Sequence, residues 1–576
     1  MNPAQLIAHF DRISDAPDAV PRLRRFILDL AVRGKLVEQC PNEEPASVLL
    51  NRIRAEKALV LRGGSIRQEK PIPRIAEADL PFPIPVTWGW SQLAEVGFLN
   101  PRNNADDELV ASFVPMPLIS AGYGVANTHQ VRQWGEVKSG YTHFAEGDVA
   151  LAKITPCFEN GKSTVFRRLA GGIGAGTTEL HVVRPVIAVA EYILIFLKSP
   201  HFIESGIPKM TGTAGQKRVP ADYFAHSPFP LPPVTEQHRI VAKVDELMSL
   251  CDRLEAAQAE RERRRDRLAA ASLHRLNQPA YTDAPEVFRE HARFYLNHLP
   301  RLTTRPEQIN QLRQTILNLA VRGRLVAQDP KDEPASELLQ RIHAQKMRMV
   351  QERKIRQHDL LPPIAPDERP FCIPECWEWT RLGTVCFLIT DGAHHTPKYE
   401  VEGVPFLSVK DVSGGAIDFA GTRFISETAH RELCKRCKPE FGDILLTKVG
   451  TTGIAVTVDV DKEFSIFVSV ALLKFSQAEI DRFYLRHLIN SPFVKRQSAD
   501  NTQGIGNKNL VLRLINQFLI PVPPLAEQRR IVAKVDELMA LCDQLEARLI
   551  GSQTESCRLL DAVLHEALAP TGLETL

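Results

Sequence analysis

Two long segments of this chain occur twice and in the same order, and this repetition limits the possible architectures more than any other feature. LPPVTEQHRIVAKVDELMSLCDRLEA, from Leu231, returns near the C-terminus as VPPLAEQRRIVAKVDELMALCDQLEA, so that Ile240 corresponds to Ile531, an offset of 291 residues (531 − 240). Upstream, RFILDLAVRGKLVEQCPNEEPASVLLNRI, from Arg25, corresponds to QTILNLAVRGRLVAQDPKDEPASELLQRI, from Gln314, an offset of 289 (314 − 25). The duplication predicts two similarly folded halves.

The sequence between the repeated segments differs in the two halves, although scattered anchors survive. Trp88 and Trp90 correspond to Trp377 and Trp379, and GDVALAKI at Gly147 corresponds to GDILLTKV. Short β-rich runs such as ELHVVRP and FVSVALLKF alternate with turns and helical pieces in both stretches. Each half therefore combines near-constant helical segments with one variable globular domain.

The repeated C-terminal segment of each half is predicted to be a long helix. It starts after a double proline, where Thr235 is a candidate N-cap in the first copy, and nothing breaks it as far as Asn277. At ~1.5 Å per residue such a helix reaches on the order of 60 Å. Its apolar residues follow the a/d spacing of a coiled coil, so we expect the two long helices to pair antiparallel. The predicted helix-pairing and subunit-docking residues are Ile240, Val244, Leu247, Cys251 and Leu254, and Ile531, Val535, Leu538, Cys542 and Leu545.

The predicted fold class is α+β, with two mixed α/β domains in tandem repeat separated by the two long helices of an antiparallel coiled coil. The predicted segments are an N-terminal constant helical region (1–80), a first variable domain (82–232), a long spacer helix (233–278), a linker with the repeated constant helical region (279–368), a second variable domain (370–522) and a second spacer helix (523–576).

Charge and cysteine content limit the functional classes. The chain has 71 basic and 69 acidic residues in 576, and the two variable domains are each balanced, with 12 of either sign in 82–232 and 17 in 370–522. A polyanion-binding role would therefore depend on the placement of charge and not on its net amount. Ten scattered cysteines indicate reduced thiols, and no run of about 18 apolar residues indicates a membrane span, so we expect a cytoplasmic protein.

Searches for catalytic and metal-binding motifs favour no enzyme. FENGKST resembles the end of a phosphate-binding loop, but Pro156 stands where the pattern needs a glycine. The tetrapeptide of amino-methyltransferases, Asn or Asp followed by Pro-Pro-aromatic, is missing, as is a Gly-x-Ser-x-Gly elbow. DGAHH from Asp391 and CKRC from Cys434 offer possible zinc ligands, but neither has a counterpart in the first half. We therefore expect neither catalytic nor metal-binding residues.

The tandem segments PLPPVTEQHRIVAKVDEL and PVPPLAEQRRIVAKVDEL, together with LAVRGKL and LAVRGRL, resemble the specificity subunits of type I restriction-modification systems over nearly the whole chain. The resemblance implies two target-recognition domains, each reading half of a bipartite asymmetric sequence in double-stranded DNA, with the helices as a spacer. It implies two modification (methyltransferase) subunits and further restriction subunits as partners. This chain would bind no cofactor: S-adenosylmethionine would bind to the modification subunits, and ATP and Mg²⁺ to the restriction subunits.

Several polar loops of the variable domains are candidates for DNA contacts, because they combine small hydrogen-bond donors, glycine and cations. An ordinary surface turn explains each loop equally well. The first-half candidates are Lys153, Thr155, Asn160, Lys162, Ser163, Gln216, Lys217 and Arg218. The second-half candidates are His394, His395, Lys398, Lys448, Thr451, Thr452, Gln503, Asn507 and Lys508.

Two other functional classes remain open at this point. The chain could be a coiled-coil interaction scaffold with duplicated protein-binding domains, or a single-chain DNA methyltransferase or nuclease with divergent motifs. Adjacent methyltransferase and translocase genes would favour the specificity subunit. A scaffold would leave DNA methylation unchanged on deletion, and an enzyme would act without partner subunits.

Overall fold

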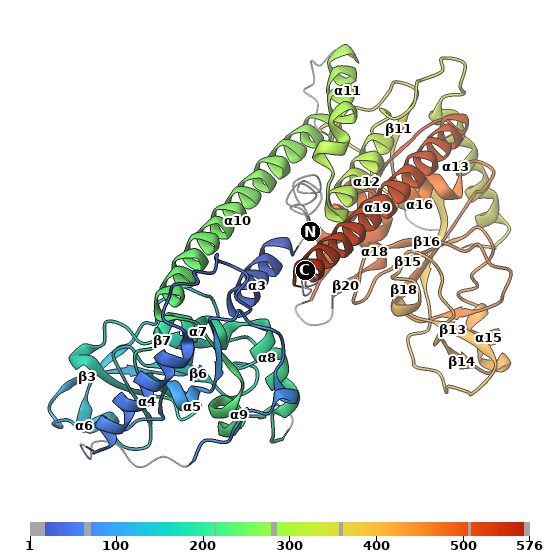
Figure 1. Ribbon diagram of the computed structural model, residues 1–576. Helices are drawn as coiled ribbons and strands as arrows, with labels where there is room; N and C mark the ends of the chain where they lie inside the picture. Colours follow the sequence, from blue (N-terminus) through green and yellow to red (C-terminus); the bar gives the residue numbers. More distant parts are fainter. Residues whose placement is uncertain are drawn as a thin grey trace. The chain divides into compact units, whose positions relative to one another are not determined.

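The computed structural model describes residues 16, 18–62, 71–213, 215–277, 285–355, 361–504 and 508–568. The chain divides into two compact units (Figure 1). The first unit contains residues 1–261 and 553–576, and the second unit contains residues 262–552. Both units mix helices and strands, so the predicted α+β class is confirmed.

The first unit and the long helix that leaves it contain the following helices and strands. The helices are α3 (Ala19–Val32), α4 (Ala46–Arg62), α5 (Leu93–Val96), α6 (Trp134–Val137), α7 (Ala190–Lys198), α8 (Pro200–Gly206), α9 (Ala221–His226) and α10 (Val234–Asn277). The strands are β1 (Gly89–Ser91), β2 (Gly97–Leu99), β3 (Val110–Val114), β4 (Gln130–Gln133), β5 (Thr142–Ala145), β6 (Val149–Ala152), β7 (Ser163–Val165), β8 (Ile173–Gly176), β9 (Leu180–Pro185) and β10 (Phe229–Leu231).

The second unit and the long helix that leaves it repeat much of this order. The helices are α11 (Pro285–Leu302), α12 (Pro306–Val321), α13 (Ala335–Gln351), α14 (Leu382–Val385), α15 (Glu427–Cys434), α16 (Arg482–Asn490), α17 (Pro492–Asp500), α18 (Leu512–Asn516) and α19 (Leu525–Leu568). The strands are β11 (Glu378–Arg381), β12 (Cys386–Asp391), β13 (Val404–Leu407), β14 (Arg423–Ile425), β15 (Ile444–Thr447), β16 (Ala455–Thr457), β17 (Ser465–Ile466), β18 (Val470–Phe475), β19 (Thr502–Gln503), β20 (Asn509–Leu510) and β21 (Leu519–Val522).

Small sheets with matching strand orders form the variable domains. The antiparallel order β2-β9-β6-β7 in the first unit corresponds to β12-β18-β15-β16 in the second. A second sheet, β4-β3-β8-β5, corresponds to the shorter β14-β13-β17, and each has one parallel pair, β3 with β8 and β13 with β17. Every residue of β6 and of β15 is buried, as expected for continuous apolar runs at the centre of a domain.

Each variable domain closes with a strand that pairs with its first strand and then leads into the long helix. β10 pairs antiparallel with β1, and β21 pairs with β11. The hydroxyl group of Tyr192 on α7 donates to the carbonyl oxygen of Pro230 at 2.9 Å, and Tyr484 on α16 donates to that of Pro521 at 3.0 Å. These equivalent bonds hold the preceding helix against the exit strand in both units.

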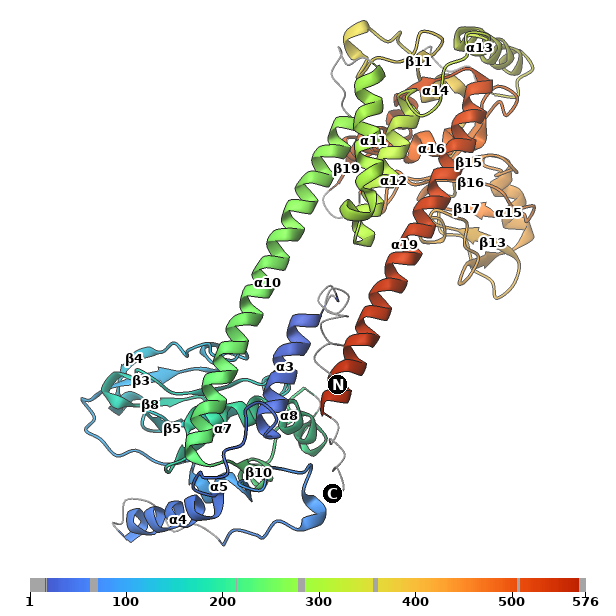
Figure 2. The same ribbon diagram turned by 45° about the horizontal axis from the view of Figure 1, so that its top comes forward.

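The long helices begin directly after the double prolines, as predicted, and each has 44 residues (Figure 2). The N-cap prediction for Thr235 is wrong, because this residue lies inside the first turn of α10. The backbone N–H of Gln237 donates to the carbonyl oxygen of Pro233 at 2.9 Å, so the first intrahelical bond already starts from the proline. The side-chain amide of Gln237 donates to the carbonyl oxygen of Pro232, also at 2.9 Å.

The predicted apolar stripe of each long helix is buried within its own unit. Ile240 and Val244 have no exposed surface and join a core with α3 and α7, while Ile531 and Val535 are equally buried in the second unit. Cys251 and Cys542 are buried in the same two cores. The half-buried residues Leu247, Leu254, Leu538 and Leu545 pack against these cores. These six buried side chains are therefore not accessible to a docking subunit, and the pairing of the two long helices with each other stays a prediction.

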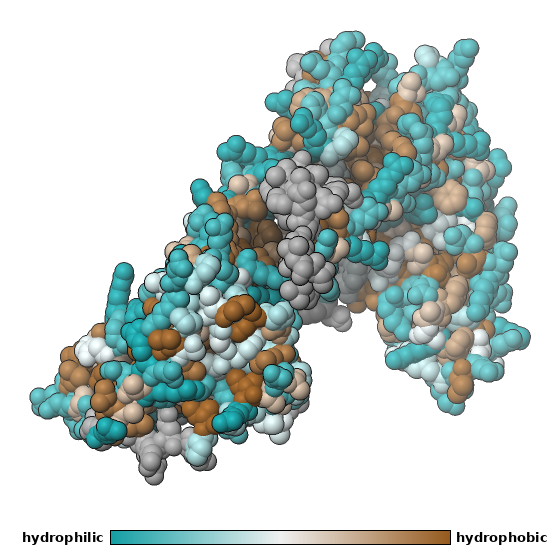
Figure 3. Space-filling view, in the orientation of Figure 1, coloured by the Kyte–Doolittle hydropathy of each residue, from teal (hydrophilic) through white to brown (hydrophobic). Residues whose placement is uncertain are grey.

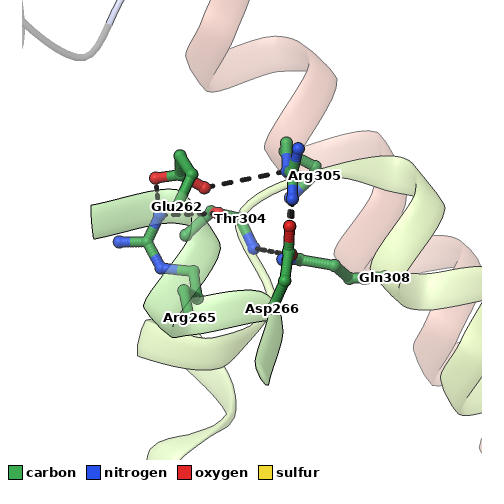
Figure 4. A network of polar contacts seen from close by, with 6 residues as sticks. All are labelled: Glu262, Arg265, Asp266, Thr304, Arg305 and Gln308. Carbon is green, nitrogen blue, oxygen red and sulfur yellow. Dashed lines mark hydrogen bonds and ion pairs between the residues drawn. The ribbon is translucent and has the colours of Figure 1, made fainter. Parts of the chain in front are cut away.

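The far end of each long helix belongs to the other unit. Leu560 and Val563 of α19 pack against Ala16 and Ala19 in the first unit, and Leu273 and Leu276 of α10 pack against α11 in the second. In the second unit, a polar network then ties α10 to the start of α12 (Figure 4). Its members are Glu262, Arg265, Asp266, Thr304, Arg305 and Gln308.

The carboxylate of Asp266 is at the centre of this network. It accepts hydrogen bonds from the guanidinium group of Arg305 and from the side-chain amide of Gln308, the latter at 2.8 Å. Arg265 donates to the hydroxyl group of Thr304 at 3.1 Å. The hydrogen bonds from Arg305 and Gln308 lower the free energy of the charged carboxylate, so the pKa of Asp266 lies below its usual value.

Surface hydropathy shows no continuous apolar band on the face in view. Hydrophilic residues and separate apolar ones alternate over both units (Figure 3). Among the described residues, no helix combines the length and the apolar character that a bilayer crossing requires.

Candidate nucleic-acid interface

The two candidate loops of the first variable domain lie next to each other. The loop after β6 is joined to the segment before β10 by two backbone hydrogen bonds. The N–H of Thr155 donates to the carbonyl oxygen of Lys217 at 2.9 Å, and the N–H of Val219 donates to that of Lys153 at 2.8 Å. Loops that are 62 residues apart in the sequence (217 − 155) thus form one surface.

The second variable domain has the same bridge at the corresponding positions. The N–H of Gly450 donates to the carbonyl oxygen of Lys508 at 2.9 Å, and the N–H of Leu510 donates to that of Lys448 at 2.7 Å. The hydroxyl groups of Thr452 and Thr502 lie 3.1 Å apart and tie the two loops a second time. In both halves the structure brings the two candidate loops together, while their contact with DNA stays a prediction.

The candidate side chains of the first domain divide into exposed and internally bonded groups. Asn160, Gln216 and Lys217 are exposed, and Lys153 and Thr155 are half-buried. Lys162 is half-buried, with its ammonium 3.4 Å from the carbonyl oxygen of Met116. Ser163 is only 2% exposed and its hydroxyl group donates to the carbonyl oxygen of Gly161, so it does not face solvent.

Arg218 is bound to a carboxylate and is not a free cation. Its guanidinium group makes two hydrogen bonds to Glu179, at 2.9 and 2.8 Å. The hydrogen bonds from Arg218 lower the pKa of Glu179, so the pair stays charged at neutral pH.

The second domain places a buried carboxylate behind its candidate loops. Asp391, at the end of β12, is 2% exposed and accepts from the ammonium of Lys448 at 3.0 Å and from the imidazole of His394, also at 3.0 Å. Burial raises the pKa of Asp391, but the hydrogen bonds from Lys448 and His394 outweigh this effect and the pKa is lowered overall. Lys448 itself is 5% exposed, so in this structure its charge is used inside the domain and not presented to a phosphate.

Arg436 was not predicted, although it belongs to the same cluster. It follows α15, donates to the carboxylate of Asp391 and lies 3.1 Å from the imidazole Nε2 of His394. Its side chain is 54% exposed. The run CKRC, which the sequence analysis considered only for metal ligands, was the signal that could have pointed to this arginine.

The remaining candidates of the second domain are exposed or lie outside the described residues. His395, Lys398, Thr451, Gln503 and Lys508 are exposed, and Thr452 is half-buried. Lys398 lies 3.8 Å from a carboxylate oxygen of Glu400 and is 89% exposed. Asn507 lies outside the described part of the chain.

The cysteines of the CKRC run lie in protein surroundings. Cys437 is buried in the second domain, which raises the pKa of its thiol to about 12. The sulfur of Cys434 lies 3.5 Å from the imidazole of His430. Within the described ranges, no group of three or more His, Cys, Asp or Glu side chains has the arrangement of a metal site.

Comparison with known sequences gives a consistent result over most of the chain. Residues 374–552 match the family described as type I restriction modification DNA specificity domain. The specificity subunit of the type I restriction enzyme EcoEI of Escherichia coli is 39% identical over 570 residues, which cover 95% of this chain and 94% of that subunit. The EcoAI specificity subunit, also of Escherichia coli, is 39% identical over 557 residues with the same coverage.

Two solved structures align with most of this chain at low sequence identity. A chain from a study of complex assembly and conformational transition of the type I R-M system aligns with a TM-score of 0.49 at 21% identity, covering 85% of this chain and all of that chain. The HsdS subunit of Thermoanaerobacter tengcongensis aligns with a TM-score of 0.43 at 21% identity, covering 85% and 98% of the two chains.

Proposed function

This chain belongs to the family of type I restriction enzyme specificity subunits, and on that premise we propose that its two variable domains each read one half of a bipartite, asymmetric DNA site. As a specificity subunit it is not itself an enzyme. The proposed chemistry is supplied by its partners, with S-adenosylmethionine on two modification subunits that methylate adenine, and ATP and Mg²⁺ on the restriction subunits.

One observation carries this proposal: both domains hold their polar loops with the same backbone bridge, but the side chains on the bridge differ. Lys217 and Arg218 of the first domain correspond to Lys508 and Asn509 of the second. A fixed backbone platform with variable side chains fits two readers that approach DNA in the same way and recognise different bases. Two different readers in one chain imply a non-palindromic site.

The charged groups at the two bridges also differ. The first domain presents Lys217 beside the Arg218–Glu179 pair, whereas the second presents Lys508 and, at the Asp391 cluster, Arg436 and His394. Arginine can bind the acceptor edge of guanine with two parallel hydrogen bonds, and a carboxylate behind the arginine fixes its direction. Among its described residues, the first variable domain has no equivalent of the Asp391 cluster. The cluster therefore supports the proposal that the second domain reads its half-site with groups that the first domain lacks.

The long helices support the proposal of two docked modification subunits. Leu250 on α10 and Leu541 on α19 occupy corresponding positions and are 41% and 51% exposed, respectively. Nearby, Lys243 pairs with Glu246 and Lys534 pairs with Glu537, both at 2.9 Å. Two copies of the same exposed surface fit two copies of the same partner.

Methylome sequencing tests the proposed function directly. In the host with its modification subunits, we expect methylated adenines in a two-part sequence motif, and we expect this methylation to disappear when the gene is deleted. Replacing residues 82–232 with the first variable domain of another family member should change one half of the motif and leave the other half intact. Unchanged adenine methylation on deletion, or a change in both halves after the exchange, would contradict the proposal.

A further inference from the structure

A cavity of about 580 Å³ in the second unit lies between the end of α10, α12 and the start of α17. Its polar lining includes Asn318, Arg322 and Arg496, and its apolar lining includes Leu273 and Phe493. Hydrogen bonds hold the walls together: the amide of Asn277 on α10 donates to the hydroxyl group of Thr315 at 3.1 Å, and the amide of Asn318 donates to the side-chain oxygen of Asn277 at 3.0 Å. The cavity is thus formed by side chains with fixed positions.

The first unit has four ion pairs at the corresponding place. Arg33 binds Asp29 at 3.2 Å and Arg22 binds Asp18 at 2.6 Å, each four residues apart in the sequence. The other two pairs connect α3 to α8 and to the end of α19, and they are Arg25 with Glu204 and Arg22 with Asp561. Three guanidinium groups thus face four carboxylates, so no positive charge among them lacks a counter-charge.

The repeat keeps only one of these four carboxylates in the second unit, because Asp18 corresponds to Glu307. By the offset of 289 residues, Asp29 corresponds to Asn318, and Arg22, Arg25 and Arg33 correspond to Gln311, Gln314 and Arg322. Ser199-Pro200 aligns with Ser491-Pro492, so Glu204 corresponds to Arg496, and by the offset of 291 residues Asp561 corresponds to Ala270. Glu307 does not line the cavity, whose lining contains two arginines and no acidic residue.

The surroundings of Arg322 leave its guanidinium group incompletely bonded. The group lies over the ring of Phe371, 4.3 Å from the ring centre, and its Nε atom is buried without a hydrogen-bond acceptor. Burial, together with the charges of Arg324 and Arg496, lowers the pKa of Arg322. Within the part of the chain that the structure describes, no ion pair joins a carboxylate to Arg322 or Arg496. A buried donor without a partner is unfavourable, and an anion that enters the cavity would relieve this.

We propose that this cavity is a binding site for an oxyanion, a carboxylate or phosphate group on an apolar body, with the anion held between Arg322 and Arg496. The planar guanidinium group matches the geometry of both oxyanions. Leu273 and Phe493 provide a surface for the apolar part. The volume lies within the range of about 300–1,000 Å³ that is typical of small-molecule sites. The site does not depend on the proposed DNA reading.

Calorimetric titration of the full chain with phenyl phosphate, inorganic phosphate and benzoate tests this proposal. We expect saturable binding of one ligand per chain, with phenyl phosphate binding more tightly than inorganic phosphate because it also covers the apolar wall. Phenyl phosphate and benzoate share the aromatic ring, so tighter binding of phenyl phosphate would identify phosphate as the preferred group, and tighter binding of benzoate would identify a carboxylate. Both orders support an oxyanion site.

Variants in both units separate the cavity from general surface charge. Arg496→Gln, at an exposed position, and Arg322→Gln should each weaken phenyl phosphate binding by about tenfold or more, the effect of losing one charge-assisted hydrogen bond. Arg25→Gln, which places in the first unit the residue type found at Gln314, should leave binding unchanged. The unfolding midpoint of Arg496→Gln shows that the variant is folded. The proposal is overturned if no ligand saturates in the millimolar range or if both cavity variants bind like the wild type.

Discussion

Lys198 is a buried cation that makes stability depend on pH. It ends α7, is 6% exposed, and its ammonium donates to the carbonyl oxygens of Ala121 and Gly161, both at 3.0 Å. Burial lowers the pKa of Lys198 to about 7, whereas an unfolded lysine titrates near ~10.4. Between these values the unfolded chain binds one proton more than the folded chain, so this residue makes stability rise with pH across that window.

Lys198→Asn tests this effect, because asparagine stands at the corresponding position 490. The free energy of unfolding of the wild type should rise relative to the variant by up to about 1.4 kcal/mol per pH unit between roughly pH 7 and 10. Urea unfolding at several pH values in this range gives the difference. The exposed Lys217→Asn serves as the matched control and should show no such trend. Parallel pH profiles of wild type and Lys198→Asn would contradict the assignment.

Asp391 should be the most sensitive position of its cluster to a single substitution. Asp391→Asn removes the counter-charge of the buried Lys448 and should lower the free energy of unfolding by about 3–5 kcal/mol, as is typical when one member of a buried ion pair is lost. Replacing both partners by apolar residues, Asp391→Leu with Lys448→Met, should restore much of this loss. Urea unfolding of the two variants measures the coupling. Equal destabilisation of the single and double variants would show that the pair does not act as a unit.

The sequence predicted which loops carry polar side chains, but it did not predict which of these side chains face solvent. Lys448 and Ser163 were both chosen as DNA contacts and both are buried. The burial of Lys448 depends on Asp391, which lies 57 residues away in the sequence. Arg436 was missed for the same reason, because it binds the carboxylate of Asp391, which lies at the end of β12 and far from Arg436 in the sequence. Local composition contains no information about such distant partners.

The long helices were the most predictable elements. The first helix was predicted between 235 and 277, and the structure has it at Val234–Asn277. The prediction succeeded because the double proline marks the start of the helix and no helix-breaking residue follows before Asn277. The apolar stripe was also predicted. The neighbour of this stripe was predicted to be the other long helix, but a spacing of three and four residues defines only the buried face of a helix and not what covers it. In the first unit α3 and the variable domain cover the stripe, and in the second unit α12 and the variable domain cover it.

The exposed leucines of these helices are expected to determine how many modification subunits bind. Leu250→Asp should reduce the bound modification subunits from two to one, and Leu541→Asp should do the same, because each places a charge on one copy of the proposed docking surface. The double variant should bind none. Mass measurement of the purified complexes counts the subunits.

Neither leucine substitution should change the stability of the isolated chain by more than about 0.5 kcal/mol, because both side chains lie on the surface. Leu268→Asp provides the control, since this leucine is 47% exposed on α10 at a position that corresponds to the half-buried Leu559. Full binding of two subunits by the double variant would place the docking surface elsewhere.

The charge balance of the whole chain predicts weak DNA binding in isolation. With 71 basic and 69 acidic residues, the chain has little excess charge to attract phosphates. A protein that neutralises six to ten phosphates loses about 10³–10⁵ in affinity between 50 and 200 mM salt. We expect the isolated chain to show little specific mobility shift at physiological salt and the complex with modification subunits to show a strong one. Tight specific binding by the chain alone would contradict this.

The last turns of α19 should be required for the first unit and not for the second. Deleting residues 553–576 removes Leu560, Val563 and the Arg22–Asp561 pair from α3. Hydrogen exchange should become faster in α3, whereas α12 should keep its protection because α10 still covers it. A chain that lacks only residues 569–576 is the control. Equal loss of protection in α3 and α12 would show that the two units are not independent.

The discontinuity of the first unit also determines the order in which the chain can fold during synthesis. Residues 262–552 form one continuous stretch, so the second unit has all its parts as soon as Ser552 has left the ribosome. The first unit is synthesised earlier but must wait for its final helical turns. Domains usually fold from the N-terminus onward. In this protein the unit that is begun first is completed last, and its α3 helix stays without part of its partner surface until the end of α19 has been synthesised.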